Sequence, residues 1–269
     1  MTDPKIYTLK ATDGKARRGE VTTPHGTFQT PAFMPVGTVA TVKALTCEDL
    51  ESIGAEIILG NTYHLYLRPG TKVIEQSGGL AKFNGWHKPT LTDSGGYQVF
   101  SLKDISKITD DGVAFQSHID GSRHLFTPER VMDIQHAIGA DIIMAFDQCV
   151  EYPATEQMAA EGVRRTFAWA KRSLQRHTEL SQDREKPPLL FGIIQGSVYD
   201  TLRTRSAEQL VPMDFPGFAI GGLSVGESKT EMEDSLAHTV QYMREDKPRY
   251  LMGIGYPEDI LMAASHGID

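Results

Sequence analysis

The feature that most constrains the fold is a short apolar segment that recurs along the chain. Each copy ends in glycine or a polar residue, and a loop and often a helix-like stretch follow it. Short apolar runs bounded by helix-breaking residues are typical of parallel strands that are buried on both faces. The seven segments are Phe33–Thr38, Glu56–Thr62, Pro89–Gly96, Asp141–Cys149, Leu189–Ser197, Gly217–Ser224 and Arg249–Gly255.

Helical patterns lie between several of these segments. Thr127 is a predicted N-cap and Pro128 stands in the first turn, before apolar residues at helical spacing. Further helices are predicted over Glu156–His177, around Ser206–Leu210 and over Lys229–Met243. Strands that alternate with helices indicate an α/β fold.

Seven such strands favour a (β/α)8 TIM-type barrel over a doubly wound sheet. No GxGxxG motif opens a helix near the N-terminus, so the signature of a dinucleotide-binding domain is missing. We predict a single barrel domain over residues 1–269, with strands one to seven present in this chain and the C-terminal strand absent.

Composition excludes several classes of protein. No apolar run approaches the ~20 residues of a membrane span, and the N-terminus lacks the apolar core of a signal peptide. The two cysteines, Cys47 and Cys149, are too few for a zinc site built from three or four sulfurs. We therefore expect free thiols, a cytoplasmic location and no membrane partner. A net charge of −8 shows no basic footprint for nucleic acid, although a local basic patch would suffice.

Polar and glycine residues follow the predicted strands at corresponding positions. Catalytic groups of barrel enzymes lie where the strands end and the loops to the helices begin. The residues at these positions are Asn61, Asp93, Ser94, Gly95, Gly96, Tyr97, Asp147, Cys149, Gln195, Gly221, Gly222, Met252 and Gly253.

This combination suits a planar, polar heterocycle. A carboxylate can accept two N–H groups, Gln195 can donate to a carbonyl, and paired glycines let the backbone come close. Tyr97 and Met252 could cover the two faces of a ring. Two carboxylates, Asp93 and Asp147, also suit glycosidic-bond chemistry. From the residues alone we infer a barrel enzyme that acts on a glycoside or a nucleoside-like ligand.

Taken singly, each of these residues also has a purely structural explanation. An aspartate at a strand end often caps a loop, and paired glycines often meet the needs of a turn. Cys149 can be a small buried residue, and Met252 can be part of a core. The hypothesis therefore rests on the whole set, which recurs at five separate strand ends.

Six longer motifs resemble the tRNA-guanine transglycosylase family of the bacterial type, also called queuine tRNA-ribosyltransferases. They occur in order through the chain and at the family's spacing. The motifs are LGNTYHLYLRPG (Leu59–Gly70), LTDSGGYQVFSL (Leu91–Leu102), FDQCVEYPA (Phe146–Ala154), FGIIQGS (Phe191–Ser197), GGLSVGE (Gly221–Glu227) and RYLMGIGYPEDI (Arg249–Ile260).

The resemblance implies a glycosyltransferase that exchanges guanine at the wobble position of tRNAs with GUN anticodons. In bacteria the incoming base is 7-aminomethyl-7-deazaguanine, on the route to queuosine. The implied mechanism is a double displacement, in which a carboxylate attacks ribose C1′, guanine leaves and the new base displaces the enzyme. The target base must leave the anticodon-loop stack and be recognised by hydrogen bonds and stacking. The resemblance also implies a homodimer.

The resemblance assigns roles residue by residue. Asp93 matches the general acid/base, Asp147 and Gln195 match the groups that recognise the base edge, and Tyr97 and Met252 match the pair that sandwiches the ring. The other substrate-binding matches are Ser94, Gly95, Gly96, Cys149, Gly222 and Leu223. Cys149 and Val225 follow the bacterial pattern that favours the aminomethyl precursor. The RNA-contacting loop matches Gly253, Ile254, Gly255, Tyr256, Pro257, Glu258 and Asp259.

Several family features have no counterpart in this sequence. The family nucleophile is an aspartate that would lie just beyond Asp269, and Asp269 itself matches a supporting residue. The family's zinc, which is expected for the full-length protein, is bound by three cysteines and a histidine in a C-terminal subdomain that is also absent here. Gln148 replaces a usual glutamate, and Tyr256 replaces a common lysine of the RNA loop.

We therefore expect the N-terminal part of a bacterial-type transglycosylase, which would not complete base exchange as 269 residues. Two alternatives stay open. One is a non-catalytic relative that binds the base or tRNA. The remoter one is an unrelated barrel glycosidase that uses Asp93 and Asp147.

Overall fold

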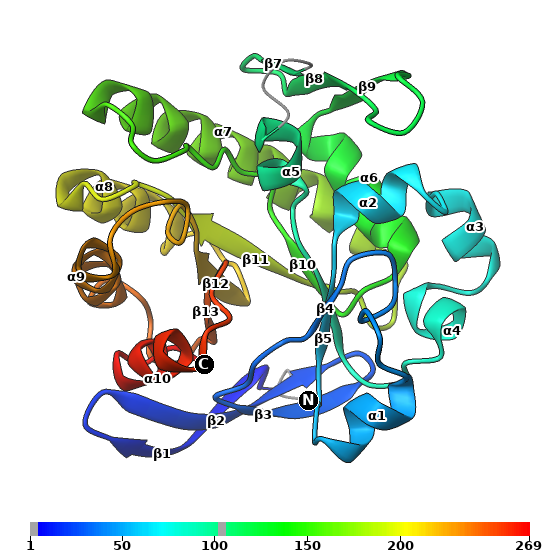
Figure 1. Ribbon diagram of the computed structural model, residues 1–269, viewed down its shortest axis with the longest axis horizontal. Coiled ribbons are helices and arrows are strands. Elements are labelled where there is room, and N and C mark those ends of the chain that lie inside the picture. Colours follow the sequence, from blue (N-terminus) through cyan, green and yellow to red (C-terminus); the bar gives the residue numbers. More distant parts are fainter. Residues whose placement is uncertain (1–4, 102–105) are drawn as a thin grey trace.

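The computed structural model (Figure 1) describes residues 5–101 and 106–269, so that residues 1–4 and Leu102, at the end of one motif, lie outside it. Within these ranges, all seven predicted segments supply strands of one parallel sheet, in the order β13-β12-β11-β10-β6-β5-β4. The strands are β4 (Val36–Gly37), β5 (Ile58–Gly60), β6 (Thr90–Thr92), β10 (Ile142–Met144), β11 (Leu189–Ile194), β12 (Gly217–Ile220) and β13 (Arg249–Leu251).

Each strand of this sheet pairs in parallel with the next one along the chain. The sheet curls, and the helices lie outside it (Figure 1). This is the arrangement of a TIM-like half-barrel, in which the carboxyl ends of the strands meet at one mouth. The α/β prediction is therefore confirmed.

Three of the four predicted helices begin where the sequence predicts them, and α1–α5 and α10 were not predicted. The Thr127 side chain accepts a hydrogen bond from the Arg130 N–H at 3.1 Å, which caps α6. α7 continues past the predicted end at His177, and α9 stops before Met243. The helices are α1 (Cys47–Ser52), α2 (Thr62–Leu67), α3 (Thr71–Gln76), α4 (Leu80–Asn84), α5 (Gly96–Ser101), α6 (Pro128–Ile138), α7 (Glu156–Ser181), α8 (Asp200–Leu210), α9 (Lys229–Val240) and α10 (Pro257–Ser265). None within the described ranges is long and apolar enough to cross a membrane.

The two faces of the parallel sheet belong to two different cores. Along β10, Ile142 and Met144 pack inside the curl, whereas Ile143 packs outward against the helices. The same alternation occurs in β11, where Phe191 points inward and Leu190 outward. Successive side chains of a strand point to opposite faces, and both faces are buried here. This explains why the strands are continuous apolar runs in the sequence.

Two antiparallel sheets were not predicted. The first consists of β1 (Tyr7–Asp13), β2 (Ala16–Thr23) and β3 (Gly26–Thr30), and the second of β7 (Ser106–Ile108), β8 (Val113–Gln116) and β9 (Arg123–Phe126). Tyr7, Val21 and Phe28 of the first sheet belong to the core inside the curl. This sheet therefore covers the inner core at the amino ends of the parallel strands, where His25 contacts Asp141 before β10 and Gln29 contacts Glu56 before β5 (below the parallel sheet in Figure 1).

Asp269 lies between the two edge strands of the parallel sheet. Its N–H donates to Arg249 O at the start of β13 (2.9 Å), and its carbonyl accepts from the Ala32 N–H ahead of β4 (2.8 Å). Its carboxylate accepts hydrogen bonds from the Tyr7 hydroxyl and the Arg249 N–H and lies 3.2 Å from the Arg17 guanidinium. Burial raises the pKa of Asp269, and Arg17 opposes that rise.

Candidate functional site

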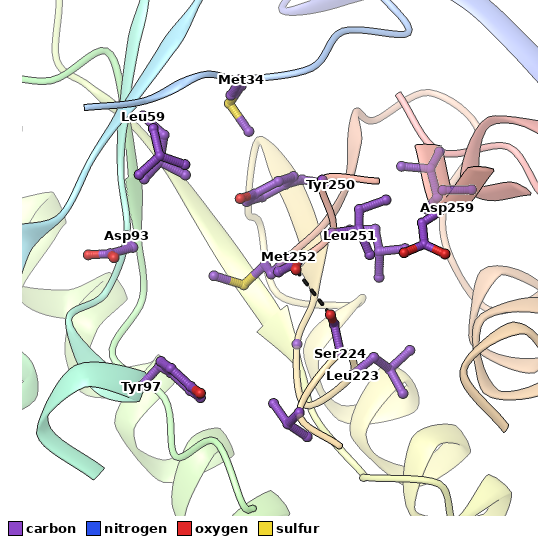
Figure 2. Close-up of a pocket in the computed structure, with 18 of the residues that line it drawn as sticks. Met34, Leu59, Asp93, Tyr97, Leu223, Ser224, Tyr250, Leu251, Met252 and Asp259 are labelled. Atoms are coloured by element: carbon purple, nitrogen blue, oxygen red, sulfur yellow. Dashed lines mark hydrogen bonds between the residues drawn. The ribbon is translucent and has the colours of Figure 1, made fainter. Parts of the chain in front are cut away.

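A cavity of about 760 Å³ opens at the carboxyl ends of the parallel strands. Its walls come from the segment that precedes β4 and from the loops that follow β5, β6, β10, β11, β12 and β13, so that residues far apart in sequence meet there. Figure 2 shows Asp93 and Leu59 on one wall and Leu223, Tyr250 and Met252 on another. The cavity lies where a barrel-like fold places its ligands.

All of the predicted substrate-binding residues except Gly96 line this cavity. Gly96 begins α5 just behind the wall, and a Cβ on it would lie 2.7 Å from Asp147 O. Glycine is therefore needed there for the close approach of two loops. Asn61, also noted at a strand end, lies on the wall as predicted.

Asp93 follows β6 and is only 8% exposed. Its Oδ1 accepts the N–H groups of Thr62 (2.8 Å) and Gly95 (3.1 Å). Its Oδ2 accepts the side-chain amides of Asn61 (2.5 Å) and Gln98 (3.1 Å). Burial raises the pKa of Asp93, and these four donors act against the rise. The result is a firmly held carboxylate whose pKa lies above its ordinary value.

Asp147 follows β10 and is 4% exposed. Its two carboxylate oxygens each accept one hydrogen bond, from the Ser94 hydroxyl (2.6 Å) and from the Gln195 side-chain amide (2.7 Å). Burial raises the pKa of Asp147 to about 6, and the nearby Asp93 carboxylate adds to the rise. Each carboxylate oxygen has a further lone pair, so Asp147 can still accept N–H groups from a ligand.

Cys149 lies on the wall next to Asp147 but is not a reactive thiolate. Burial raises the pKa of its thiol to about 12, with a further contribution from the Asp147 carboxylate, whereas the backbone N–H of Gly222 opposes the rise. At neutral pH the group is a neutral thiol, and a neutral thiol is a poor nucleophile.

Two side chains offer flat or polarisable surface to the cavity. Tyr97 on α5 is 53% exposed, an unusual environment for a tyrosine so close to buried carboxylates. Met252 lies after β13, where its N–H donates to Ile220 O at 3.1 Å. Figure 2 shows both side chains directed into the cavity from different elements.

The paired glycines after β12 form a tight turn at the cavity wall. Gly222 has a φ of +67°, and a Cβ on it would overlap the Gln195 side-chain oxygen. A left-handed backbone and the close Gln195 side chain together require glycine here. The sequence predicted the glycines but not this contact.

The predicted RNA loop lies at the mouth of the cavity. Gly253, Ile254, Gly255, Tyr256 and Asp259 line it, whereas Pro257 and Glu258 form the first turn of α10 away from the wall. The hydroxyl of Ser224 donates to Gly253 O at 3.0 Å, which joins this loop to the glycine turn (Figure 2).

A basic side chain at this mouth was missed in the sequence. The ammonium group of Lys229 pairs with the buried carboxylate of Asp259 and lies 5.4 Å from the Tyr256 ring centroid. Lys229 stands at the start of α9, where a lysine is normally a solvated surface residue.

Two other residues were also missed, Gln98 on the cavity wall and Arg203 behind it. Gln98 is within the TDSGGYQ motif, but Asp93 precedes α5 and the five-residue separation is not a helical spacing, so the sequence carries no signal of the contact. Arg203 lies on the same helical face as Ala207 and Leu210. A charged residue on an otherwise apolar helix face indicates a buried charge, and buried charges are often found near functional sites.

The described residues do not form a metal site. They contain no group of three or more His, Cys, Asp and Glu side chains that could hold an ion. Cys149 lies in the cavity, whereas Cys47 lies at the start of α1, where its sulfur contacts Asn84 O. The two thiols therefore do not converge. The described residues therefore do not fit the zinc implied by the family resemblance.

Comparison with known proteins agrees with the sequence motifs. The family profile "Queuine tRNA-ribosyltransferase" matches residues 12–269. A queuine tRNA-ribosyltransferase of Caldanaerobacter subterraneus subsp. tengcongensis is 56% identical over 255 residues, which are 95% of this chain and 67% of that protein. Its counterpart in Thioalkalivibrio sulfidiphilus is 56% identical over 263 residues, covering 98% of this chain and 69% of the relative.

A third relative aligns with every residue of the chain. The queuine tRNA-ribosyltransferase of Ruminiclostridium cellulolyticum is 55% identical over 269 residues, which are 100% of this chain and 70% of that protein. The chain thus spans about two thirds of the length of the curated relatives it matches.

Proposed function

Because the chain belongs to the queuine tRNA-ribosyltransferase family, we propose that its cavity serves a tRNA-guanine transglycosylase. The reaction replaces guanine at the wobble position of tRNAs with GUN anticodons by 7-aminomethyl-7-deazaguanine, in the biosynthesis of queuosine. Membership in this family removes the hypothesis of an unrelated barrel glycosidase.

The observation that carries this proposal is the Ser94–Asp147–Gln195 arrangement. A guanine ring presents two adjacent N–H donors and a carbonyl on one edge, and the free lone pairs of Asp147 suit the donors. The Gln195 amide can donate to the carbonyl, and Tyr97 and Met252 can cover the ring faces. An unstacked base is recognised in this way, by hydrogen bonds on its edge and stacking on its faces.

Asp93 is proposed as the general acid/base. When the bond between ribose C1′ and guanine N9 breaks, its electron pair goes to the base, and Asp93 gives a proton to the departing guanine. In the second half-reaction Asp93 takes the N9 proton from the incoming base, which then attacks C1′. The raised pKa of Asp93 suits a group that must hold a proton in one step and release it in the other.

We do not assign the attack on C1′ to Asp269. Its carboxylate oxygens are already engaged with Tyr7, Arg17 and the backbone of Arg249, which suits a supporting role. We propose that the attacking carboxylate lies outside residues 1–269. The 269 residues would then bind the base without exchanging it.

The finer features implied by the family are part of the same proposal. An eighth strand between β13 and β4 would close the barrel, and the backbone bonds of Asp269 to both edges support that position. tRNA would approach through its anticodon loop, at the loop of residues 253–259. A homodimer, a cytoplasmic location and a zinc held by residues outside 1–269 are proposed from the resemblance alone.

Two measurements test the proposal. Calorimetric titration of the 269-residue chain with guanine should show one saturable site, and absence of binding would overturn the proposal. Incubation with tRNA and radiolabelled guanine should leave the tRNA unlabelled, whereas label entering at an ordinary rate would show that residues 1–269 hold the nucleophile. A longer protein that contains this chain, binds tRNA and never exchanges base would support the non-catalytic relative.

A further inference from the structure

Arg203 on α8 is buried to 0% exposure without a carboxylate partner among the described residues. Within the described part of the chain, its guanidinium donates only to backbone carbonyls. Nε donates to Ser197 O at 2.7 Å, Nη1 to Gly221 O at 2.8 Å and to Ile194 O at 3.3 Å, and Nη2 to Gly222 O at 3.1 Å. Burial lowers the pKa of Arg203 to about 10, so the group remains charged at neutral pH.

These carbonyls belong to two loops of the cavity. Ile194 ends β11 directly before Gln195, Ser197 lies two residues after Gln195 in the loop that follows, and Gly221 and Gly222 form the turn after β12. A buried charge without a counter-ion is costly unless its hydrogen bonds are satisfied. A planar fork of five donors can meet carbonyls from two loops at once, which a single lysine ammonium cannot do in the same geometry.

The contacts with Gly221 and Gly222 determine which way their peptide groups face. In a trans peptide the C=O of one residue and the N–H of the next point in opposite directions. Because Gly221 O faces Arg203, the Gly222 N–H must face the other way, toward the cavity. The contact between that N–H and Cys149, a cavity residue, agrees with this orientation. Gly222 O also faces Arg203, so the Leu223 N–H of the next peptide group points away from Arg203.

We propose that Arg203 is a positioning residue, which orients the N–H groups of Gly222 and Leu223 toward a carbonyl oxygen of the bound base. Arg203 itself does not line the cavity and acts through the turn. The inference rests on the proposed function for the identity of the ligand. The orientation of the two peptide groups can be measured without any ligand.

The test compares Arg203→Met and Arg203→Lys with Leu202→Ala. Leu202 is the neighbouring buried residue of α8, and it packs with Ala159 and Val163 of α7, away from the glycine turn. Each variant is titrated with guanine and with 2-aminopurine, which lacks the carbonyl oxygen. The amide signals of Gly222 and Leu223 are followed by ¹⁵N NMR in the free protein, with circular dichroism to verify folding.

Arg203→Met should weaken guanine binding by about tenfold or more, because hydrogen bonds to the carbonyl oxygen lose their geometry. Binding of 2-aminopurine should stay within about twofold, since that base has no oxygen to lose. The Gly222 and Leu223 amide signals should shift. Leu202→Ala should lower the thermal midpoint without changing the ratio of the two affinities or those amide signals. The guanine affinity of Arg203→Lys should fall between those of wild type and Arg203→Met. If Arg203→Met does not fold, the affinities and amide signals of Arg203→Lys test the positioning role.

Unchanged guanine affinity in a folded Arg203 variant would overturn the inference, as would an equal loss for both bases. If the wild type does not bind guanine, the proposed function fails. Unmoved Gly222 and Leu223 amides in the Arg203 variants would then still reject the positioning role, and shifted amides would retain it.

Discussion

The Ser94 hydroxyl donates to Asp147 Oδ1 at 2.6 Å, which joins the loop after β6 to the loop after β10. The same hydroxyl accepts the Gly96 N–H at 3.0 Å, so that one side chain fixes the turn into α5 and the buried carboxylate together. Burial raises the pKa of Asp147, in the second of these loops, and the Asp93 carboxylate, in the first, adds to the rise. In the proposed mechanism, proton transfer by Asp93 and base recognition by Asp147 would therefore be linked through adjacent residues.

Asp147→Asn should weaken guanine binding by about tenfold or more. An asparagine amide presents its own N–H groups where the ligand also presents N–H groups, and a charge-assisted hydrogen bond is lost. Calorimetric titration at pH 7 measures the effect. The exposed Asp183→Asn is the matched control and should bind as wild type does. Equal affinities for Asp147→Asn and wild type would remove Asp147 from the base edge.

The stability of the unliganded protein should depend on pH through Asp147. Its pKa is raised from 3.8 to about 6, so the folded state binds the proton more tightly than the unfolded state. The stabilisation by protonation is full below about pH 4 and is lost as pH rises through about 6, to a limit of about 3 kcal/mol. Urea unfolding at several pH values should show the wild type losing stability relative to Asp147→Asn over this window. A difference in unfolding free energy between the two proteins that does not change with pH would contradict the raised pKa of Asp147.

Asp93→Asn, placed in a protein that completes base exchange, should reduce turnover far more than tRNA capture. Asparagine keeps the shape of the side chain but cannot give or take the proton, a role worth about 10²–10⁴ in rate. Single-turnover labelling and filter binding measure the two steps separately. Equal losses in both would argue that Asp93 holds the site together and is not the acid/base.

Gly222→Ala should destabilise the protein and weaken base binding together. The added methyl group meets both a left-handed backbone and the Gln195 side chain, and we expect a loss of about 2 kcal/mol or more in unfolding free energy. Gly14→Ala is the control, because Gly14 has a φ of +56° with open space around its Cβ. It should cost only the backbone strain, about 1 kcal/mol, and leave guanine affinity unchanged. Similar effects of the two variants on binding would show that the Gln195 contact is unimportant.

The parallel strands could be predicted because a strand that is buried on both faces requires an uninterrupted run of apolar residues. Ile142 and Ile143 face different cores, yet both must be apolar. The antiparallel strands are different. β2 carries Arg17, Arg18 and Glu20, and its inward-facing residues gain their partners only from the folded sheet. The local sequence pattern of β2 therefore does not indicate which partners its residues will have in the folded sheet.

The strand-end residues of the site were predictable for a similar reason. A barrel-like fold brings the ends of its strands to one mouth, so Asp93, Asp147 and Gln195 converge once the strands are recognised. Arg203 lies within a helix, and its partners are carbonyl groups that any residue would supply. The residue types at those positions therefore do not reveal the contact.

The hydrogen bond between Tyr7 and Asp269 spans 262 positions of the chain. During synthesis, the amino-terminal sheet leaves the ribosome long before Asp269 is made, and its contact with that residue must wait. Contacts of such high sequence separation carry a large loop-closure entropy and form late in folding. The inner core beside Tyr7 therefore gains this contact only after the residues of all seven parallel strands have been synthesised.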